Sequence, residues 1–268
     1  MTFLARHPVP LAELLLAPVI FRDGLPALAE VPEVSGSGMR DLAAFAGHSP
    51  GAIRTAMSRL RASGLVAPFE DPAGVTRYRT GALSRSVSRA VRAERPDGFV
   101  LAVFSFVTEQ VRERQVVREA LKLHGFQKLA QNVYIHGRID TIELEAVLRE
   151  EGLDEHVWLF RVPEADDPAL RRKLTALFDL TSRAAQLRAF DLDLVQFLDP
   201  GLDDDSFARR LLYAGPVHYR ITWLDEPPLP ASYLPPDYPL AEVRGRMTAL
   251  AAARAQALIA YFRRANTA

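Results

Sequence analysis

The sequence SPGAIRTAMSRLRASG, at residues 49–64, carries the clearest structural signal in the chain. Serine is favoured at the N-cap of a helix and proline at its first position, so Ser49 and Pro50 predict a helix that begins here. Gly64 is suited to end the helix, because glycine readily adopts the left-handed conformation that closes many helices. The sequence therefore predicts a helix over residues 50–61.

The two faces of this helix differ in chemistry. At about 100° per residue, one face carries the apolar side chains of Ile53, Ala56, Met57 and Leu60. Arginine can donate two hydrogen bonds to guanine, and serine or threonine can reach base edges or phosphates. We therefore expect the opposite face and its flanks to read the major groove of double-stranded DNA. The residues expected to do so are Arg54, Thr55, Ser58, Arg59 and Arg61.

The neighbouring segments predict the rest of a winged helix-turn-helix. Helices are expected at residues 11–21 and 39–46, the second closed by Gly47, and residues 31–38 are expected to form a flexible loop between them. Strands are expected at residues 65–69 and 75–80, on either side of an Asp-Pro-Ala-Gly turn. This order of helices followed by a hairpin is that of a winged DNA-binding domain.

The predicted hairpin carries two arginines on its second strand. Because side chains alternate between the faces of a strand, Arg77 and Arg79 share one face and Tyr78 points to the other, where it would pack in the core. Two arginines on a wing are suited to contact phosphates or the minor groove. We therefore expect Arg77 and Arg79 to hold the wing on the duplex.

Charge is distributed unevenly along a chain whose formal net charge is zero. Residues 35–95 hold ten arginines against four acidic residues, about +6, so the remainder carries about −6. A basic segment joined to acidic segments is typical of a protein that binds a polyanion through one domain.

The remaining segments predict two further domains. Strands at residues 99–107, 133–136 and 156–162 alternate with helices at 112–123 and 140–151, with room for another strand at 127–130. This order indicates a ferredoxin-like domain. Beyond it, helices are expected at residues 169–180, 183–190, 203–212 and 240–265, and the proline-rich residues 227–239 are expected to be irregular. The predicted fold is a multidomain α+β protein with domains at 1–95, 96–165 and 166–268.

Several classes of function find no support in the sequence. Without cysteine there are no disulfides and no thiolate-bound metals, which fits a reducing cytoplasm. No apolar stretch is long enough to span a membrane, and the first twenty residues lack the apolar core of a signal peptide. The six histidines lack metal-ligand spacing, and neither a nucleophile elbow nor a phosphate-binding glycine loop is present. We therefore expect a cytoplasmic protein that is not an enzyme and uses no cofactor.

Several motifs are shared with a known family. Residues 53–60, IRTAMSRL, followed by Ser63, Gly64 and Leu65, resemble the PaaX-type regulators, which repress phenylacetate and related aromatic catabolism. The C-terminal part is similar as well, with HYR at 218–220, DEPPLP at 225–230 and LPPDYPL at 234–240. The last motif resembles the family signature Leu-Pro-x-Asp-Trp-Pro-Gly, with Tyr238 in place of the tryptophan and Leu240 in place of the glycine.

This resemblance implies a homodimer on a palindromic operator that an aryl-CoA thioester, such as phenylacetyl-CoA, releases from DNA. It also implies that the middle domain is like the ferredoxin-like CRISPR adaptation nuclease and that the C-terminal domain is helical and regulatory. Aromatic and basic residues near the signature are candidate ligand contacts, namely Tyr213, His218, Arg220 and Trp223. The alternative for these four residues is core packing with one buried ion pair.

Two other classes of function stay open. A metal-dependent nuclease of the CRISPR-adaptation type would place an aspartate at the end of its first strand, whereas residues 99–107 contain no acid and are followed by Thr108 and Glu109. A dimerisation role for the middle domain is therefore favoured. The other alternative is an activator or architectural DNA-binding protein without a small effector, because repression and activation differ in where the operator lies.

Overall fold

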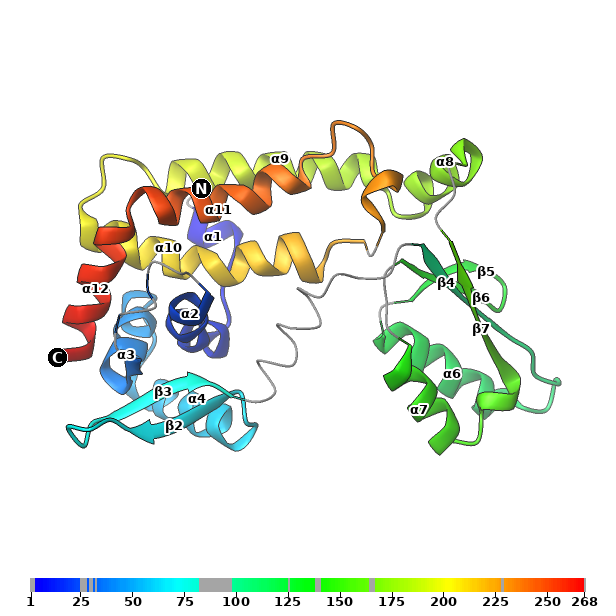
Figure 1. Ribbon diagram of the computed structural model, residues 1–268, viewed down its shortest axis with the longest axis horizontal. Helices are drawn as coiled ribbons and strands as arrows, with labels where there is room; N and C mark the ends of the chain where they lie inside the picture. The colour runs from blue at the N-terminus through cyan, green and yellow to red at the C-terminus, as the bar shows by residue number, and fades with distance from the viewer. Residues whose placement is uncertain are drawn as a thin grey trace. The chain divides into compact units, whose positions relative to one another are not determined.

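The computed structural model describes residues 3–24, 28, 31, 33–81, 98–124, 126–137, 141–163, 167–227 and 229–267. Within them the protein has a mixed α/β fold with two antiparallel sheets (Figure 1). The chain divides into two compact units, each built from separate segments. The first unit comprises Met1–Arg92, Ala184–Glu226 and Pro239–Ala268, and the second comprises Ala93–Arg183 and Pro227–Tyr238. This division differs from the three consecutive domains predicted, because the C-terminal helices fold with the N-terminal segment.

The N-terminal segment of the first unit contains helices and a small sheet. Its elements are α1 (Phe3–Arg6), α2 (Leu11–Gly24), β1 (Val34–Ser35), α3 (Gly36–Phe45), α4 (Pro50–Ala62), β2 (Val66–Glu70) and β3 (Thr76–Thr80). The strand order is β1-β3-β2. Leu14 and Leu15 of α2, Leu42 of α3, and Ile53 and Leu60 of α4 are buried in the core. The helices and the hairpin of the sequence prediction are therefore present.

The prediction of a flexible loop at residues 31–38 is wrong from Val34 onward. Val34 pairs with Tyr78 to form β1, and Ser35 caps α3 by accepting a hydrogen bond from the Gly38 N–H at 3.2 Å. The serine and glycine residues that indicated a loop therefore form a helix start, because serine at an N-cap satisfies a backbone N–H that has no partner within the helix.

Helix α4 has the ends that the sequence predicts. The Ser49 hydroxyl accepts the Ala52 N–H at 3.3 Å, and Pro50 is the first helical residue. Gly64 has φ +68°, and the Leu65 N–H bonds to the Leu60 carbonyl at 3.0 Å, which closes the last turn.

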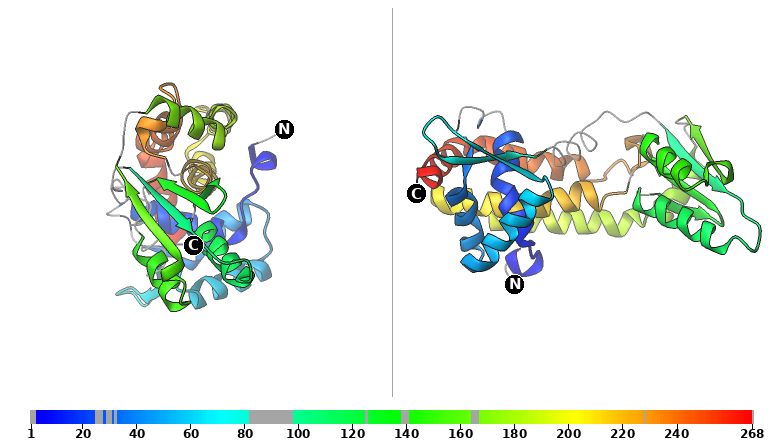
Figure 2. Two further views of the ribbon diagram at one scale, coloured as in Figure 1. Left: turned by 90° about the vertical axis from the view of Figure 1, so that its right-hand side faces the viewer. Right: turned by 90° about the horizontal axis from the view of Figure 1, so that it is seen from below.

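Long helices make up the C-terminal part of the first unit (Figures 1 and 2). They are α9 (Leu180–Phe197), which enters this unit at Ala184, α10 (Asp204–Tyr219), the π-helical turn η3 (Arg220–Leu224), α11 (Leu240–Ala253) and α12 (Ala255–Thr267). Helix α10 runs well past the predicted end at residue 212 and includes Pro216. The single helix predicted over residues 240–265 is divided at Arg254, whose ψ of 38° departs from helical geometry.

The second unit is built on a four-stranded sheet with two helices against one face (Figure 2). Its main elements are β4 (Phe99–Phe104), α6 (Val111–Leu123), β5 (Gln127–Ala130), β6 (Val133–Gly137), α7 (Ile142–Glu150), η2 (Asp154–His156), β7 (Val157–Val162), α8 (Pro168–Leu177) and η4 (Ala231–Tyr233). The strand order is β5-β6-β4-β7, and neighbouring strands are antiparallel. The strand predicted at residues 127–130 is thus present.

Each face of this sheet has its own core. Val100, Ala102 and Phe104 pack against α6 and α7, whereas Phe99 and Ile135 pack against α8 and η4. On the edge strand β7, Trp158 and Phe160 are 46% and 51% exposed. In the part of the chain that the structure describes, no helix has the length and apolar character needed to cross a membrane.

Candidate nucleic-acid interface

Helix α4 separates buried apolar residues from exposed polar ones. Ile53 and Leu60 are each 3% exposed, while Ala56 and Met57 are only half-buried, so the apolar face is narrower than the sequence predicts. The five predicted DNA-reading residues, Arg54, Thr55, Ser58, Arg59 and Arg61, are all exposed. The structure therefore brings these five side chains to the solvent side of one helix.

The donor groups of the three arginines of α4 have no partner within the part of the chain that the structure describes. Among the described residues, no side-chain hydrogen bond or ion pair involves Arg54, Arg59 or Arg61. Residues three and four apart are neighbours on a helix surface, so Arg54, Ser58 and Arg61 form one stripe with Arg59 beside it. The Thr55 hydroxyl is engaged differently, because it donates to the Gly51 carbonyl at 3.1 Å.

The start of α4 leaves room for close approach. A Cβ built on Gly51 would meet no atom within 4 Å, and Gly51 and Ala52 are both exposed. Small residues at the start of a reading helix allow its backbone to approach the floor of a groove.

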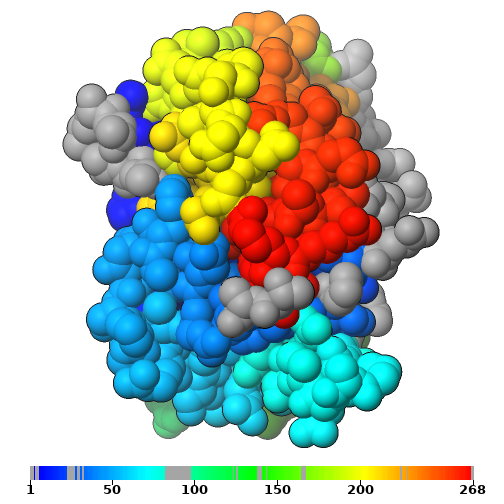
Figure 3. Space-filling model, turned by 90° about the vertical axis from the view of Figure 1, so that its left-hand side faces the viewer, coloured from blue at the N-terminus to red at the C-terminus, as the bar shows by residue number. Residues whose placement is uncertain are grey.

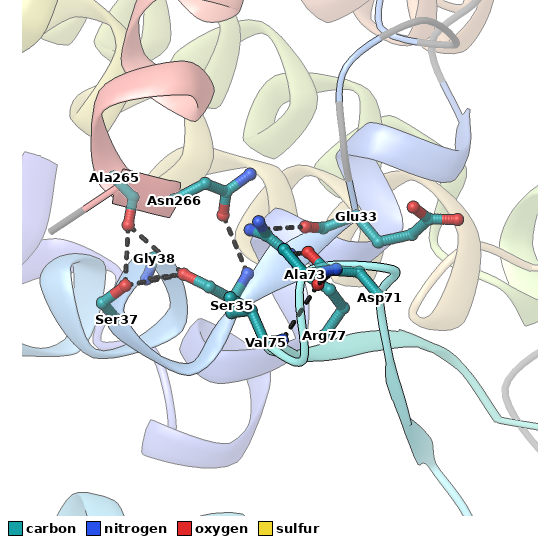
Figure 4. Close-up of polar contacts among 10 residues, drawn as sticks. All are labelled: Glu33, Ser35, Ser37, Gly38, Asp71, Ala73, Val75, Arg77, Ala265 and Asn266. Carbon is teal, nitrogen blue, oxygen red and sulfur yellow. Dashed lines mark hydrogen bonds and ion pairs between the residues drawn. The ribbon is translucent and has the colours of Figure 1, made fainter.

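The two hairpin arginines, Arg77 and Arg79, have different surroundings, although they lie only two residues apart on β3. The Arg77 side chain is 12% exposed, and its Nε donates to Oδ2 of Asp71 at 2.8 Å (Figure 4). Its Nη1 lies 3.5 Å from the Glu33 carbonyl oxygen. Arg79 is exposed, and its guanidinium lies 5.4 Å from the centre of the Phe69 ring. Arg79, unlike Arg77, therefore presents its charge to solvent.

Asp71 organises the turn between β2 and β3. Its Oδ1 accepts the N–H groups of Val75 and Ala73 at 2.9 and 3.0 Å (Figure 4). The bond from Val75, followed by that from Arg77, lowers the pKa of Asp71 below its ordinary value. Arg77 is thus part of the structure of the turn, a role that sequence alternation between strand faces does not indicate.

Two acidic residues in the sequence around α4 already pair with arginines outside that helix. Between residues 35 and 81 there are six arginines and three acidic residues. Asp71 pairs with Arg77, and Asp41 pairs with Arg209 of α10, so neither neutralises the arginines of α4. The other four arginines of the basic segment, at 85, 89, 92 and 95, lie outside the described residues.

The four predicted ligand contacts take part in packing within the first unit. Tyr213 and His218 are 6% and 8% exposed, and Nε2 of His218 lies 2.9 Å from the Val243 carbonyl oxygen. Burial lowers the pKa of His218. Arg220 donates to Oε2 of Glu13 at 3.0 Å, and the Arg244 guanidinium lies 3.6 Å from the centre of the Trp223 ring. The ligand-binding role of these residues stays a prediction.

A metal site would need several acidic or histidine side chains placed close together. Among the described residues, no group of three or more histidine, aspartate or glutamate residues is placed to hold a metal ion. Glu109, which follows the first strand of the second unit, is exposed.

Comparison with known proteins identifies the fold and leaves the family unassigned. No protein-family model matches the chain, and no curated protein matches its sequence. Among solved structures, the uncharacterized protein Rv0674 from Mycobacterium tuberculosis is similar, with a TM-score of 0.58 and 20% sequence identity. The similarity covers 92% of this chain and 97% of that one, so the two proteins share a fold over nearly their whole length.

Proposed function

We propose that this protein is a transcriptional regulator that reads double-stranded DNA through α4. The observation that carries the proposal is the exposed side of that helix. It presents three arginines whose donors have no partner among the described residues, beside serine and threonine, while Ile53 and Leu60 anchor the opposite side in the core. Guanidinium groups on a helix that fits the major groove are the commonest means of recognising guanine.

The order of elements supports the same proposal. The order of helices α2, α3 and α4 followed by the β2-β3 hairpin supports a winged helix-turn-helix in which α4 is the reading helix. The β-α-β-β-α-β order and the strand order β5-β6-β4-β7 of the second unit support a ferredoxin-like domain.

Individual residues receive distinct roles in this proposal. Arg54 and Arg59 contact base edges, and Ser58 and Arg61 contact bases or phosphates. Thr55 contributes its methyl group and an accepting hydroxyl oxygen, because its hydroxyl proton is already donated to Gly51. Arg79 contacts the backbone from the hairpin, and Arg77 supports the turn through Asp71 instead of touching DNA.

We further propose that the protein acts as a homodimer on a palindromic site. Trp158 and Phe160 give the second unit an exposed apolar edge strand, a surface that a second copy can cover. Repression of an aromatic catabolic operon and release by an aryl-CoA thioester rest on the sequence resemblance to PaaX-type regulators. Activation, architectural binding and nuclease activity are the competing assignments.

Binding to the DNA upstream of its own gene tests this function. The affinity for that duplex is measured over a range of salt, with and without phenylacetyl-CoA, together with the number of chains bound. We expect two chains per site, affinity that falls steeply with salt, and release by the thioester. Replacing Arg59 by Ala should weaken binding by about 1–3 kcal/mol. The control is Arg172→Ala, which removes an exposed arginine from α8 in the second unit.

The outcomes separate the parts of the proposal. Specific binding that no thioester affects would retain the regulator and remove the effector. Equal losses in R59A and R172A would mean that α4 does not read DNA. Metal-dependent cleavage of the duplex would favour the nuclease.

A further inference from the structure

Helix α3, which packs against α4, is held by two helices from the far end of the chain. The carboxylate of Asp41 on α3 accepts hydrogen bonds from Nε and Nη2 of Arg209 on α10, at 3.0 and 3.1 Å. It also accepts the hydroxyl of Tyr261 on α12, at 2.9 Å. Asp41 thus joins α3 to α10 and α12 through three hydrogen bonds.

The surroundings of Asp41 keep these bonds in place. Arg209 also pairs with Asp205 at 2.6 Å, and Asp205 pairs in turn with Arg264 of α12. Burial alone would raise the pKa of Asp41, but the hydrogen bonds from Arg209 and Tyr261 lower it below its ordinary value. Burial raises the pKa of Tyr261, which is 1% exposed, so its hydroxyl stays protonated and able to donate.

A second set of bonds ties the start of α3 to the end of α12. The Ser35 N–H donates to Oδ1 of Asn266 at 2.8 Å, and the Ser37 hydroxyl donates to the Ala265 carbonyl at 2.9 Å (Figure 4). Surface contact between α3, α10 and α12 is visible in Figure 3, where α10 is yellow and α12 is red. Both the start and the middle of α3 are therefore fixed to the C-terminal helices.

The position of α4 depends on α3. Helix α4 packs mainly against α2, α3 and β2, and only a short turn separates it from α3. Buried Leu42 of α3 and Ile53 of α4 belong to the same unit. A change in the angle of α3 would therefore move the exposed arginines of α4.

We propose that Asp41 is a positioning residue for DNA reading. Its bonds to Arg209 and Tyr261 fix α3, and through it α4, to α10 and α12. The C-terminal helices thereby set the orientation in which α4 meets the groove, and any partner that moves them alters recognition. This inference rests on the proposed function of α4.

The first unit offers a matched control for the Asp41 pair. Arg246 of α11 makes the same two-bond contact with Asp191 of α9, at 3.1 and 3.0 Å. Both of these residues lie on helices other than α3 and α4. Asp191→Asn therefore removes a similar interaction from the same unit without removing a bond that holds α3.

The experiment compares the full-length wild type with the variants Asp41→Asn, Tyr261→Phe and Asp191→Asn. For each, the affinity is measured for a duplex that the wild type selects from a random pool and for a scrambled duplex, at one salt concentration. The thermal midpoint of unfolding is recorded as well. We expect D41N to lower the ratio of specific to scrambled affinity by about tenfold. Y261F should lower the ratio less, and D191N should leave it unchanged.

The alternative results are distinguishable. A purely structural role would lower the unfolding midpoint in D41N and D191N alike and leave both affinity ratios at the wild-type value, which would overturn the inference. Loss of selectivity in R59A, with selectivity kept in D41N and Y261F, would overturn it as well. A wild type without any preference for a duplex would overturn the proposed function, and this inference with it.

Discussion

Arg59 and Arg77 show how much the surroundings of one residue type decide its role. Arg59 lies exposed on α4, and among the described residues no hydrogen bond or ion pair involves its side chain. Arg77 lies on β3 with its side chain 12% exposed and bonded to Asp71. Strand alternation places Arg77 and Arg79 on one face, but it does not reveal that an aspartate six residues earlier engages only the first.

The Asp71 turn gives a prediction about pH. Because the pKa of Asp71 is lowered in the folded protein, first by the Val75 N–H and then by Arg77, the ionised carboxylate stabilises the folded state. This contribution is complete above the ordinary aspartate pKa of about 3.9 and is lost as pH falls through the lowered value. We therefore expect the unfolding free energies of the wild type and Asp71→Asn to differ at pH 7 and to converge on acidification.

Denaturant unfolding from pH 7 to pH 2 measures this difference. Asp225→Asn, at an exposed position whose carboxylate is not part of the turn, serves as the control. A difference between the wild type and D71N that is constant over the whole range would show that the charge of Asp71 does not stabilise the turn.

At the scale of elements, helices and strands with strong local signals were predictable. Ser49, Pro50 and Gly64 define the ends of α4 through their own conformational preferences, and the structure confirms these ends. Features that depend on distant partners, namely strand β1 and the start of α3, were missed. Strand β1 forms because Val34 pairs with Tyr78, and α3 begins at Gly36 beside residues near the end of the chain.

The length of α10 is another feature that depends on packing. Proline lowers helix stability, so the sequence favours an end before Pro216, yet α10 continues to Tyr219. Its buried residues, among them Leu211, Tyr213 and Val217, pack within the first unit. Tertiary contacts of this kind outweigh local preference, because most helical stability in proteins comes from packing and not from intrinsic propensity.

Contact between α10 and α2 predicts the effect of a glycine replacement. A Cβ on Gly215 would lie 2.0 Å from Cε2 of Phe21, so the Phe21 ring or one of the two helices would have to shift. We therefore expect Gly215→Ala to lower the free energy of unfolding by about 1–3 kcal/mol, although alanine favours helices. Gly245→Ala on α11 is the control, because a Cβ there meets nothing within 4 Å.

Denaturant unfolding of both variants checks the result. Since G245A gains helix propensity without a clash, it should be neutral or stabilising by up to about 1 kcal/mol. Equal stabilisation by both replacements would show that α2 and α10 are not in close contact at Gly215.

At the scale of the whole molecule, the division into units was not predictable from the proline and glycine residues that mark the ends of segments. Arg209 and Tyr261 lie 168 and 220 residues beyond Asp41, and no local pattern indicates that they meet it. Proline and glycine mark where segments end, but they carry no information about which segments pack together. The candidate DNA-reading face, by contrast, lies on one helix and was visible in the periodicity of its sequence.

The central claim is that α4 reads DNA sequence, and selection from a random pool of duplexes tests it most directly. Wild-type protein and the variants Arg59→Ala, Arg54→Ala and Arg61→Ala are each used to enrich duplexes, which are then sequenced. We expect the wild type to enrich a defined site with twofold symmetry, and R59A to lose preference at one position in each half of that site. A wild-type pool without an enriched sequence, or an identical site enriched equally well by R59A, Arg54→Ala and Arg61→Ala, would contradict the claim.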